Sequence, residues 1–298
     1  MDLSTKIVSL HFKLIQNNML VFTKKSELGV FLEPLIKQKK AIGFVPTMGA
    51  LHNGHLSLIK ESIKNNQVTV ASIFVNPTQF NKKEDLENYP RTLESDLSML
   101  QGASCDIAFI PSIEEIYADT VGANHFEFDG LEIQMEGKFR KGHFNGVGTI
   151  VKKLFEIVTP TNAYFGEKDF QQLQIIRKMV QKNQLPVSVI GCPTFREKNG
   201  LAMSSRNQLL SGKEKEEAAI IYKILHEVKQ LIDKKSIEMI NSWVAAQFDK
   251  NPLFELEYFV IADEDTLIPA STISSNKNYR AFIAVHAGEV RLIDTTAL

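Results

Sequence analysis

The 298-residue sequence contains no apolar run of about 18 residues, so it predicts no membrane-spanning helix and no membrane partner. It is also poor in cysteine. Only Cys105 and Cys192 are present, and no group of cysteines and histidines has the spacing of a zinc site. We therefore expect both cysteines to be buried, unreactive thiols of a cytoplasmic protein.

The chain has almost no net charge, because 34 lysine and arginine residues offset 35 aspartate and glutamate residues. This balance argues against a broad nucleic-acid-binding surface and selects no other partner by charge. Arginine is scarce, with seven residues against 27 lysines. Lysine therefore supplies the general solubility. Because arginine is rare in this chain, the position of each arginine is a stronger indication of a specific role than usual.

Residues 1–18 lack the apolar core and cleavage site of a signal peptide and the arginines of a transit peptide, so we interpret them as an N-terminal extension. From Met19 onward, short uninterrupted apolar runs alternate with helical stretches, a pattern that indicates a parallel sheet covered on both faces. We predict an α/β fold in which residues 19–193 form a doubly wound, Rossmann-like domain. Its strands are expected at 19–23, 41–45, 68–75, 106–110, 163–165 and 187–192.

The pattern changes after Pro193. Asn199-Gly200 predicts a β-hairpin, and Ser211 with Glu214 predicts the capping box of a long helix that ends near residue 235. A further helix is expected over 236–248, followed by strands at 255–262, 280–285 and 290–293. This change predicts a smaller α+β C-terminal domain over residues 194–298.

The most informative segment is Pro46-Thr-Met-Gly-Ala-Leu-His-Asn-Gly-His55. A buried strand ends near Pro46, a glycine-containing loop follows, and a helix begins at about Gly54. His52 and His55 are therefore expected at a helix N-terminus, whose N–H groups bind phosphate. A single histidine is more often structural, but two in a strand-loop-helix favour a ligand site. Their protonation state is left open by the sequence.

His52-Asn-Gly-His55 resembles the HxGH signature of the adenylyl-transferring superfamily that includes the class I aminoacyl-tRNA synthetases. The longer segment resembles the pantothenate synthetase family, and the resemblance extends from about residue 19 to the C-terminus. Five further segments match that family in the same order. They are Phe74-Val-Asn-Pro-Thr-Gln-Phe80, Tyr89-Pro-Arg-Thr92, Glu136-Gly-Lys-Phe-Arg-Lys-Gly-His-Phe144, Phe165-Gly-Glu-Lys-Asp-Phe-Gln-Gln172 and Gly200-Leu-Ala-Met-Ser-Ser-Arg206.

Two of these segments suit phosphate binding by their chemistry alone. Lys168 follows a predicted strand and so projects from the carboxyl edge of the sheet, where open α/β folds bind ligands; the alternative is a solvated surface lysine. Ser204, Ser205 and Arg206 form either a loop that closes on a triphosphate or a simple serine-capped turn. The resemblance implies that His55, His52, Lys168 and Arg206 are catalytic. It implies an ATP site of Met48, Gly49, His52, His55, Gly166, Glu167, Lys168, Asp169, Phe195, Met203, Ser204, Ser205 and Arg206.

Four of the seven arginines lie in or beside the matching segments. These are Arg91, Arg140, Arg196 and Arg206. The forked guanidinium group suits phosphate and carboxylate, but structural ion pairing remains the alternative for Arg91 and Arg140. Phe195 departs from the family, which usually has a smaller aliphatic residue at this position near adenine.

Gln79 and Gln172 are candidates for the acid substrate, because a neutral amide orients a carboxylate nucleophile without neutralising it. The resemblance implies that both hold pantoate and that Gln79 also lies near β-alanine. Asp96 is the candidate Mg²⁺ ligand, since Mg²⁺ uses one or two carboxylates together with substrate phosphates. Some relatives have further polar groups nearby, where this chain has Ser95 and Met99.

The resemblance implies an ATP-dependent ligase that condenses pantoate with β-alanine through a pantoyl adenylate and releases AMP and pyrophosphate. It also implies Mg²⁺ and a homodimer formed through the first domain. The mixed anhydride must be protected from water, which favours a C-terminal domain that acts as a lid. Another nucleotidyltransferase of the HxGH superfamily and a non-catalytic nucleotide-binding module are the alternatives. No nucleic-acid partner is expected.

Overall fold

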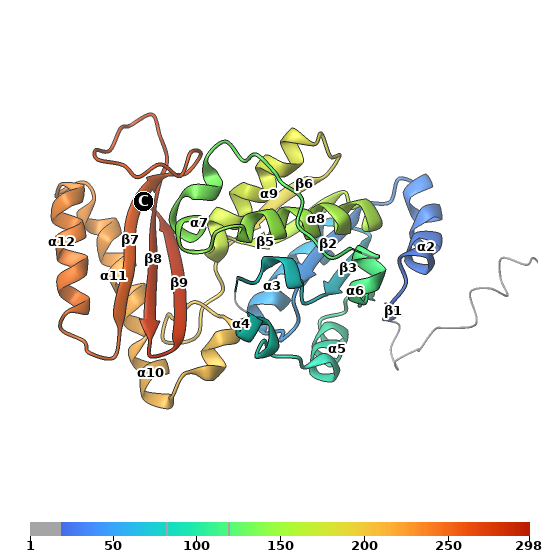
Figure 1. Ribbon diagram of the computed structural model, residues 1–298, viewed down its shortest axis with the longest axis horizontal. Coiled ribbons are helices and arrows are strands. Elements are labelled where there is room, and N and C mark those ends of the chain that lie inside the picture. The colour runs from blue at the N-terminus through green and yellow to red at the C-terminus, as the bar shows by residue number, and fades with distance from the viewer. Residues whose placement is uncertain (1–18, 82, 119) are drawn as a thin grey trace, which may run out of the picture. The chain divides into compact units, whose positions relative to one another are not determined.

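The computed structural model describes residues 19–81, 83–118 and 120–298, so the predicted extension lies outside the described residues. The chain forms two compact units, and Figure 1 shows the elements of each. The first unit contains residues 19–126, Gly142–Phe165 and Ile176–Cys192. The second contains Glu127–Lys141, Gly166–Ile175 and Pro193–Leu298.

The first unit is built on a six-stranded parallel sheet, as predicted. Its strand order is β1-β4-β3-β2-β5-β6. The central strands are almost completely buried, which explains why their sequences are mostly apolar and contain no charged residue. The strands are β1 Leu20–Phe22, β2 Ile42–Thr47, β3 Val68–Ile73, β4 Ile107–Phe109, β5 Asn162–Gly166 and β6 Ser188–Cys192.

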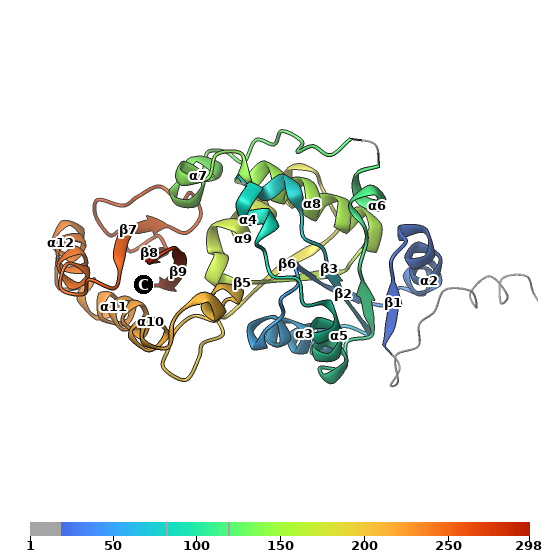
Figure 2. The same cartoon turned by 60° about the horizontal axis from the view of Figure 1, so that its bottom comes forward.

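Helices cover both faces of this sheet (Figure 2). α3 and α5 lie on one face, and α2 and α8 on the other. The core between α3, α5 and the strands includes Val45, Ile59 and Leu100, all fully buried. The helices associated with this sheet are α2 Lys25–Lys37, α3 Asn53–Asn65, α4 Lys83–Glu87, α5 Leu93–Gly102, α6 Ile113–Tyr117, α8 His143–Val158 and α9 Phe170–Lys182.

The strand order reverses between β2 and β5. From β2 the sheet continues through β3 and β4 on one side, and through β5 and β6 on the other. In open α/β sheets, ligands bind outside the carboxyl ends of the strands at such a switch point. The strand β2 precedes the two histidines in the sequence, and β5 precedes Lys168.

Ser112 and Glu115 have the Ser-x-x-Glu spacing of a capping box, which forms only in part. Ser112 Oγ accepts a hydrogen bond from the Glu115 N–H at 3.2 Å. The Glu115 carboxylate does not return to Ser112, because it accepts from the Lys25 N–H at 2.9 Å. The sequence therefore predicted the start of α6 but not the partner of its acidic residue.

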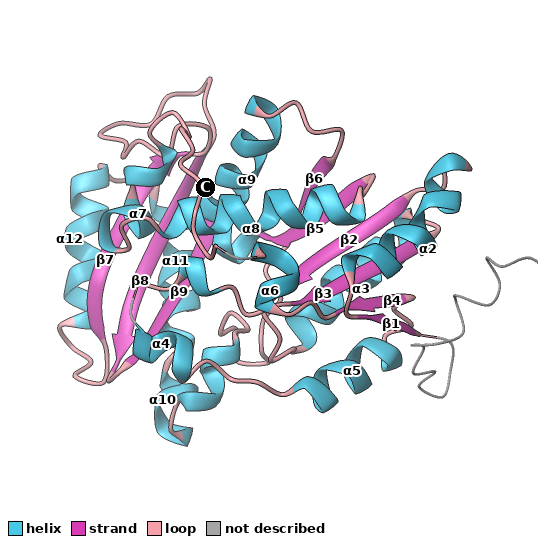
Figure 3. Ribbon diagram, turned by 45° about the vertical axis from the view of Figure 1, so that its right-hand side comes forward, coloured by secondary structure: helices cyan, strands magenta, loops and turns pink. Residues whose placement is uncertain are grey.

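The second unit contains the antiparallel sheet β7 Glu255–Asp263, β8 Tyr279–Ala287 and β9 Val290–Ala297. Helices α11 Ala219–Leu231 and α12 Ile237–Phe248 pack on it (Figure 3). Their apolar faces form a core with the sheet that includes Ile224, Ile240, Val244 and Ile283. The predicted α+β organisation is confirmed.

In the second unit, one local prediction is wrong and another is confirmed only in part. The long helix predicted from Ser211 divides at Ala218 into α10 Gly212–Glu217 and α11, because the turn tightens and the Ile221 N–H bonds to the Ala218 carbonyl three residues back. The predicted hairpin is reduced to one bridge between Arg196 and Ala202, with Gly200 at a φ of +97° in its turn. The capping box of Ser211 and Glu214 is confirmed.

Two segments predicted in the first domain pack with the second unit. Residues 127–141, which include α7 Met135–Phe139, are joined to β9 by the ion pair between Glu136 and Arg291. Residues 166–175 are joined to β8 by the ion pair between Glu167 and Arg280. The domain division at residue 193 itself stays a prediction. Within the described residues, every helix is too short or too polar to cross a membrane.

Candidate active site

The two histidines form a reciprocal pair at the N-terminus of α3. The Gly54 N–H donates to His52 Nδ1 at 3.1 Å, and the His52 N–H donates to His55 Nδ1 at 3.2 Å. The ring centroids are 4.0 Å apart. Because both Nδ1 atoms accept hydrogen bonds from the backbone, each neutral ring carries its hydrogen on Nε2. The helix cap thus selects the tautomer of the neutral rings, while their protonation state stays open.

Asp96 fixes the loop that leads to these histidines. Its side chain is buried, with 1% of its surface exposed. Oδ2 accepts from the Ala50 N–H at 3.0 Å, while Oδ1 accepts from the Leu51 N–H at 2.7 Å and from Thr92 Oγ1 at 3.1 Å. A Cβ atom at Gly49 would lie 3.0 Å from Asp96 Oδ2, so glycine allows this close approach.

These contacts give Asp96 a structural role, and its assignment as the Mg²⁺ ligand stays a prediction. An ionised carboxylate has about four lone-pair sites, and Asp96 uses two on Oδ1 and one on Oδ2 for hydrogen bonds inside the protein. The residues that the structure describes contain no group of three or more acidic, histidine or cysteine side chains able to hold a metal ion.

Gln79 lies next to Met48, so the structure brings together two of the predicted ligand-binding residues. Gln79 Nε2 donates to Met48 Sδ at 2.8 Å, and Gln79 Oε1 accepts from Asn76 Nδ2 at 3.1 Å. Asn76 is in turn held by the Tyr117 hydroxyl at 2.6 Å. The ring of His143 contacts the Gln79 carbonyl oxygen through Nδ1 at 2.8 Å.

Sequence reasoning did not assign these supporting residues. Asn76 and His143 lie within the matching segments, so their positions were available as a signal. Tyr117 lies outside those segments and is 41 residues from Asn76 in the sequence. Only the folded structure shows that its hydroxyl orients the Asn76 amide.

The neighbours Gln171 and Gln172 have different surroundings. Gln171 is buried, and its amide accepts from the Glu136 N–H at 2.9 Å and donates to the carbonyls of Leu131 and Gln134 at 2.8 and 2.9 Å. Gln172 takes part in none of these bonds and is half-buried. Gln171 is thus structural, and Gln172 remains the candidate for substrate.

Lys168 lies in the short 3₁₀ turn η3, Glu167–Asp169, which follows β5 directly. Its Nζ is 3.5 Å from Asp169 Oδ1, and 17% of the side chain is exposed. An ammonium group has three N–H donors, so the contact with Asp169 leaves donors for a ligand. This arrangement favours a phosphate contact over the fully solvated surface lysine that was the alternative.

The loop of Met203 to Arg206 is fixed by its own turn. Ser204 Oγ accepts from the Arg206 N–H at 3.3 Å, and the Met203 N–H donates to the Phe195 carbonyl at 2.9 Å. Ser205 is buried, whereas 42% of the Phe195 surface is exposed. The serine-capped turn therefore exists, and a cap at Ser204 is compatible with a ligand at Arg206.

Two of the four singled-out arginines have structural roles. Arg91 donates to the carbonyls of Leu86, Glu87 and Tyr89 at the end of α4. Arg196 makes two hydrogen bonds of 2.6 and 3.1 Å to the carboxylate of Asp294.

Arg140 combines a structural contact with an unusual electrostatic environment. It lies 3.7 Å from Glu136. Burial lowers the pKa of Arg140, the negative charge of Glu136 opposes this shift, and the positive charge of Arg206 adds to the lowering. Arg140 is therefore influenced both by the positive charges of Arg206 and Arg291 and by the negative charges of Glu136 and Asp169.

The predicted site residues fall into two sets. The first unit holds Met48, Gly49, His52, His55, Gln79 and Asp96, and the second holds Gly166, Glu167, Lys168, Asp169, Gln172, Phe195, Met203, Ser204, Ser205 and Arg206. Both cysteines are buried as predicted, and burial raises the pKa of Cys105 to about 12, which excludes a thiolate at neutral pH.

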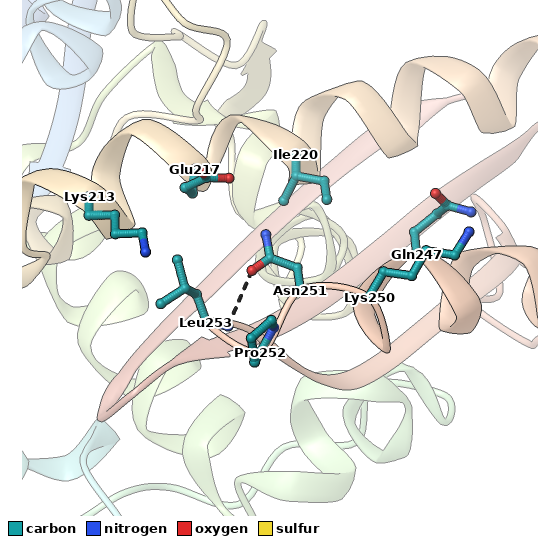
Figure 4. A pocket seen from close by; sticks show the side chains of 8 residues that line it. All are labelled: Lys213, Glu217, Ile220, Gln247, Lys250, Asn251, Pro252 and Leu253. Carbon is teal, nitrogen blue, oxygen red and sulfur yellow. Dashed lines mark hydrogen bonds between the residues drawn. The ribbon is translucent and has the colours of Figure 1, made fainter.

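The second unit also has a hollow of about 480 Å³ that is lined by none of these residues. Figure 4 shows its side chains, which come from α10, α11, α12 and the loop before β7. In that loop the Asn251 side-chain oxygen accepts from the Leu253 N–H at 3.2 Å. The lining residues are Lys213, Glu217, Ile220, Gln247, Lys250, Asn251, Pro252 and Leu253, none of which was a predicted site residue.

The model of the pantoate-beta-alanine ligase family matches residues 20–297. The chain belongs to this family. It is 54% identical over 281 residues to the pantothenate synthetase of Flavobacterium psychrophilum, covering 94% of this chain and 100% of that protein. It is 50% identical to the pantothenate synthetase of Christiangramia forsetii, covering 94% of this chain and 99% of that protein.

Two solved structures of the family are similar throughout. The crystal structure of pantothenate synthetase from Thermus thermophilus has a TM-score of 0.85 at 39% identity, covering 93% of this chain and 98% of that one. The pantoate-beta-alanine ligase from Francisella tularensis, complexed with beta-gamma ATP and beta-alanine, has a TM-score of 0.77 at 36% identity, covering 94% and 97%. The predicted family, fold class and ligase activity are confirmed.

Proposed function

We propose that this chain uses ATP to condense pantoate with β-alanine through a pantoyl adenylate. A pantoate carboxylate oxygen attacks the α-phosphorus of ATP, and the bond to the departing pyrophosphate breaks. The β-alanine amine then attacks the acyl carbon, AMP departs, and water takes the proton from nitrogen. The observation that carries this proposal is the histidine pair at the N-terminus of α3, after the strand beside the switch point.

The departing pyrophosphate accumulates negative charge, so the useful protein groups are fixed donors. His52 and His55 offer Nε2–H groups, because their Nδ1 atoms accept from the backbone. We assign the phosphates to these rings together with Lys168, Ser204, Ser205 and Arg206, and the remaining nucleotide contacts to Met48, Gly49, Gly166, Glu167, Asp169, Phe195 and Met203. No enzyme nucleophile is required, in agreement with the buried thiols.

A product assay separates this proposal from its nearest alternative. With pantoate and Mg-ATP, we expect AMP to accumulate over many turnovers only when β-alanine is added, because the adenylate is consumed by the amine. Another nucleotidyltransferase would release pyrophosphate without forming AMP. Release of pyrophosphate with no AMP in the presence of β-alanine would overturn the proposal.

We further propose that Gln79 and Gln172 hold pantoate and that Gln79 also lies near β-alanine. Gln79 is held by Met48 on one side and Asn76 on the other, so its amide is oriented before substrate arrives. Both side chains are neutral, and the carboxylate keeps its nucleophilic charge.

Replacing Gln172 with alanine is expected to weaken pantoate binding by about tenfold or more, the loss of one to two hydrogen bonds. ATP binding should change little. Isothermal titration calorimetry with each substrate measures both affinities. Gln171→Ala is the matched control, because it removes three buried hydrogen bonds and should lower stability. Equal losses of pantoate and ATP affinity in Gln172→Ala would contradict the assignment.

We propose that Mg²⁺ is held by the nucleotide phosphates rather than by Asp96. The ion neutralises phosphate charge when bound. Asp96 acts on the protein alone, where it holds the Ala50 and Leu51 amides and thereby the loop before His52.

The variant Asp96→Asn tests this division of roles. A neutral amide has one acceptor oxygen for two backbone N–H groups, so we expect the free energy of unfolding to fall by about 1–3 kcal/mol in urea titrations. The Mg²⁺ concentration for half-maximal turnover should stay within about twofold of the unmodified protein. The exposed neighbour Ser95→Ala is the control. Unchanged stability with a much higher Mg²⁺ requirement would make Asp96 a ligand.

The family resemblance also motivates a cytoplasmic homodimer formed through the first domain, with residues 194–298 as a lid. A closing lid would protect the mixed anhydride from water. Analytical ultracentrifugation measures the oligomeric state directly, and a monomer at micromolar concentration would overturn the dimer.

A further inference from the structure

Arg280 on β8 contacts the chain on both sides of Lys168. Its Nη2 lies 3.4 Å from the Glu167 carboxylate, the residue before Lys168. Its guanidinium group lies over the Phe170 ring, two residues after Lys168, at 3.9 Å from the centroid. Arg280 is only 5% exposed and lies outside the segments that match the family.

Arg280 is itself held in place. Its Nε donates to Glu264 at 2.8 Å, and its Nη1 donates to Thr295 Oγ1 on the neighbouring strand at 3.1 Å. A guanidinium group is planar, so these bonds and the Phe170 contact fix its orientation as well as its position.

The same region secures the following helical turn. Phe170 also packs against Phe282 of β8, with ring centroids 6.0 Å apart. Further along, the Gln174 side chain donates to the Glu264 carbonyl. The Gly166–Ile175 segment is therefore attached to the second unit at Glu167, Phe170 and Gln174, and Lys168 lies within the attached stretch.

We propose that Arg280 is a positioning residue for Lys168 in adenylate formation. The inference rests on the phosphate-contacting role proposed for Lys168. A lysine side chain has four rotatable bonds, so the placement of its backbone limits where the ammonium group can reach. A displacement of about 1 Å at such a group costs up to about a hundredfold in rate. Lysine at position 280 cannot replace arginine. Its ammonium group lacks the forked N–H donors that bind Glu264, Thr295 and Glu167, and it lacks the planar face that lies over Phe170.

A double-mutant cycle tests this coupling. The variants are Arg280→Met, Lys168→Met and the double variant, and the readout is the single-turnover rate of adenylate formation from pantoate and ATP. We expect Lys168→Met to be about 10²–10³-fold slower and Arg280→Met about ten- to a hundredfold slower. The double variant should be no slower than Lys168→Met, because Arg280 acts through Lys168.

Two further variants separate positioning from stability. Val244→Ala removes buried volume from α12 in the core of the same unit, and it should lower stability while leaving the rate near normal. Phe170→Leu keeps an apolar side chain but removes the stacking face, and it should be several-fold slower without a further loss in the Lys168→Met background. If Arg280→Met does not fold, Phe170→Leu tests the positioning role in its place.

The outcomes distinguish the two proposals. A double variant whose rate loss equals the product of the single losses, or a near-normal Arg280→Met, would overturn the positioning role while leaving Lys168 intact. A near-normal Lys168→Met would overturn the role of Lys168 in the proposed function, whatever Arg280→Met does, and the inference with it.

Discussion

Replacing His55 with alanine is expected to slow ATP–pyrophosphate exchange by about 10²–10³-fold, the usual effect of removing one fixed donor to a developing charge. The substitution removes the Nε2–H donor and also the acceptor for the His52 N–H. The effect should fall mainly on the rate, since the donor is needed most as pyrophosphate departs. The measurement is exchange of labelled pyrophosphate into ATP with pantoate present.

Two companion variants separate catalysis from folding. His55→Gln restores an acceptor for the helix cap, so it should recover stability but only part of the exchange rate. His226→Ala, at an exposed position of α11, should behave as the unmodified protein. Near-normal exchange in His55→Ala would remove the histidine from the proposed mechanism.

Replacing Gly146 with alanine is expected to disrupt the support of Gln79. A Cβ atom at this position of α8 would lie 2.2 Å from the Thr78 carbonyl oxygen and 2.8 Å from Gln79 Cα. These atoms belong to the backbone and cannot rotate away, so α8 and the Pro77–Gln79 turn must separate. Overpacking of this kind costs about 1–3 kcal/mol, occasionally more. Urea unfolding and calorimetry with pantoate should both show a loss.

Gly29→Ala provides the contrast. Gly29 lies inside α2 with no atom within 4 Å of an added Cβ, so alanine there should stabilise the helix by up to about 1 kcal/mol. If Gly146→Ala unfolds at the same urea concentration as the unmodified protein and binds pantoate normally, the turn does not depend on this close approach.

The sequence predicted the sheet of the first unit well because its signal is local. Each central strand is a short apolar run, and β2 and β3 begin and end within two residues of the predicted positions. The sequence did not predict that the helix divides at Ala218. Alanine is a good helix former, and the tightened turn does not change the spacing of apolar residues along the sequence. Glu115 likewise has the spacing of a capping box, but its carboxylate accepts a hydrogen bond from the Lys25 N–H, 90 residues away in the sequence.

The candidate site shows the same distinction. His52 and His55 interact within one turn, so their spacing alone was informative. Asp96 matched a metal ligand by residue type, and only the fold shows that its oxygens accept backbone hydrogen bonds. The sequence did not predict a role for Arg280, because the proposed role depends on its contact with Glu167, 113 residues earlier in the chain.

The interleaved second unit has a consequence for how the protein is made and engineered. The ion pair between Glu136 and Arg291 can form only after Arg291, which lies 155 residues later in the sequence, has been synthesised. On the ribosome, the first early stretch can form this pair only after β9 has emerged, and the second can form its Glu167–Arg280 pair only after β8 has emerged. A chimaera between relatives that exchanges only the C-terminal third would split these pairs, so the three stretches should be exchanged together.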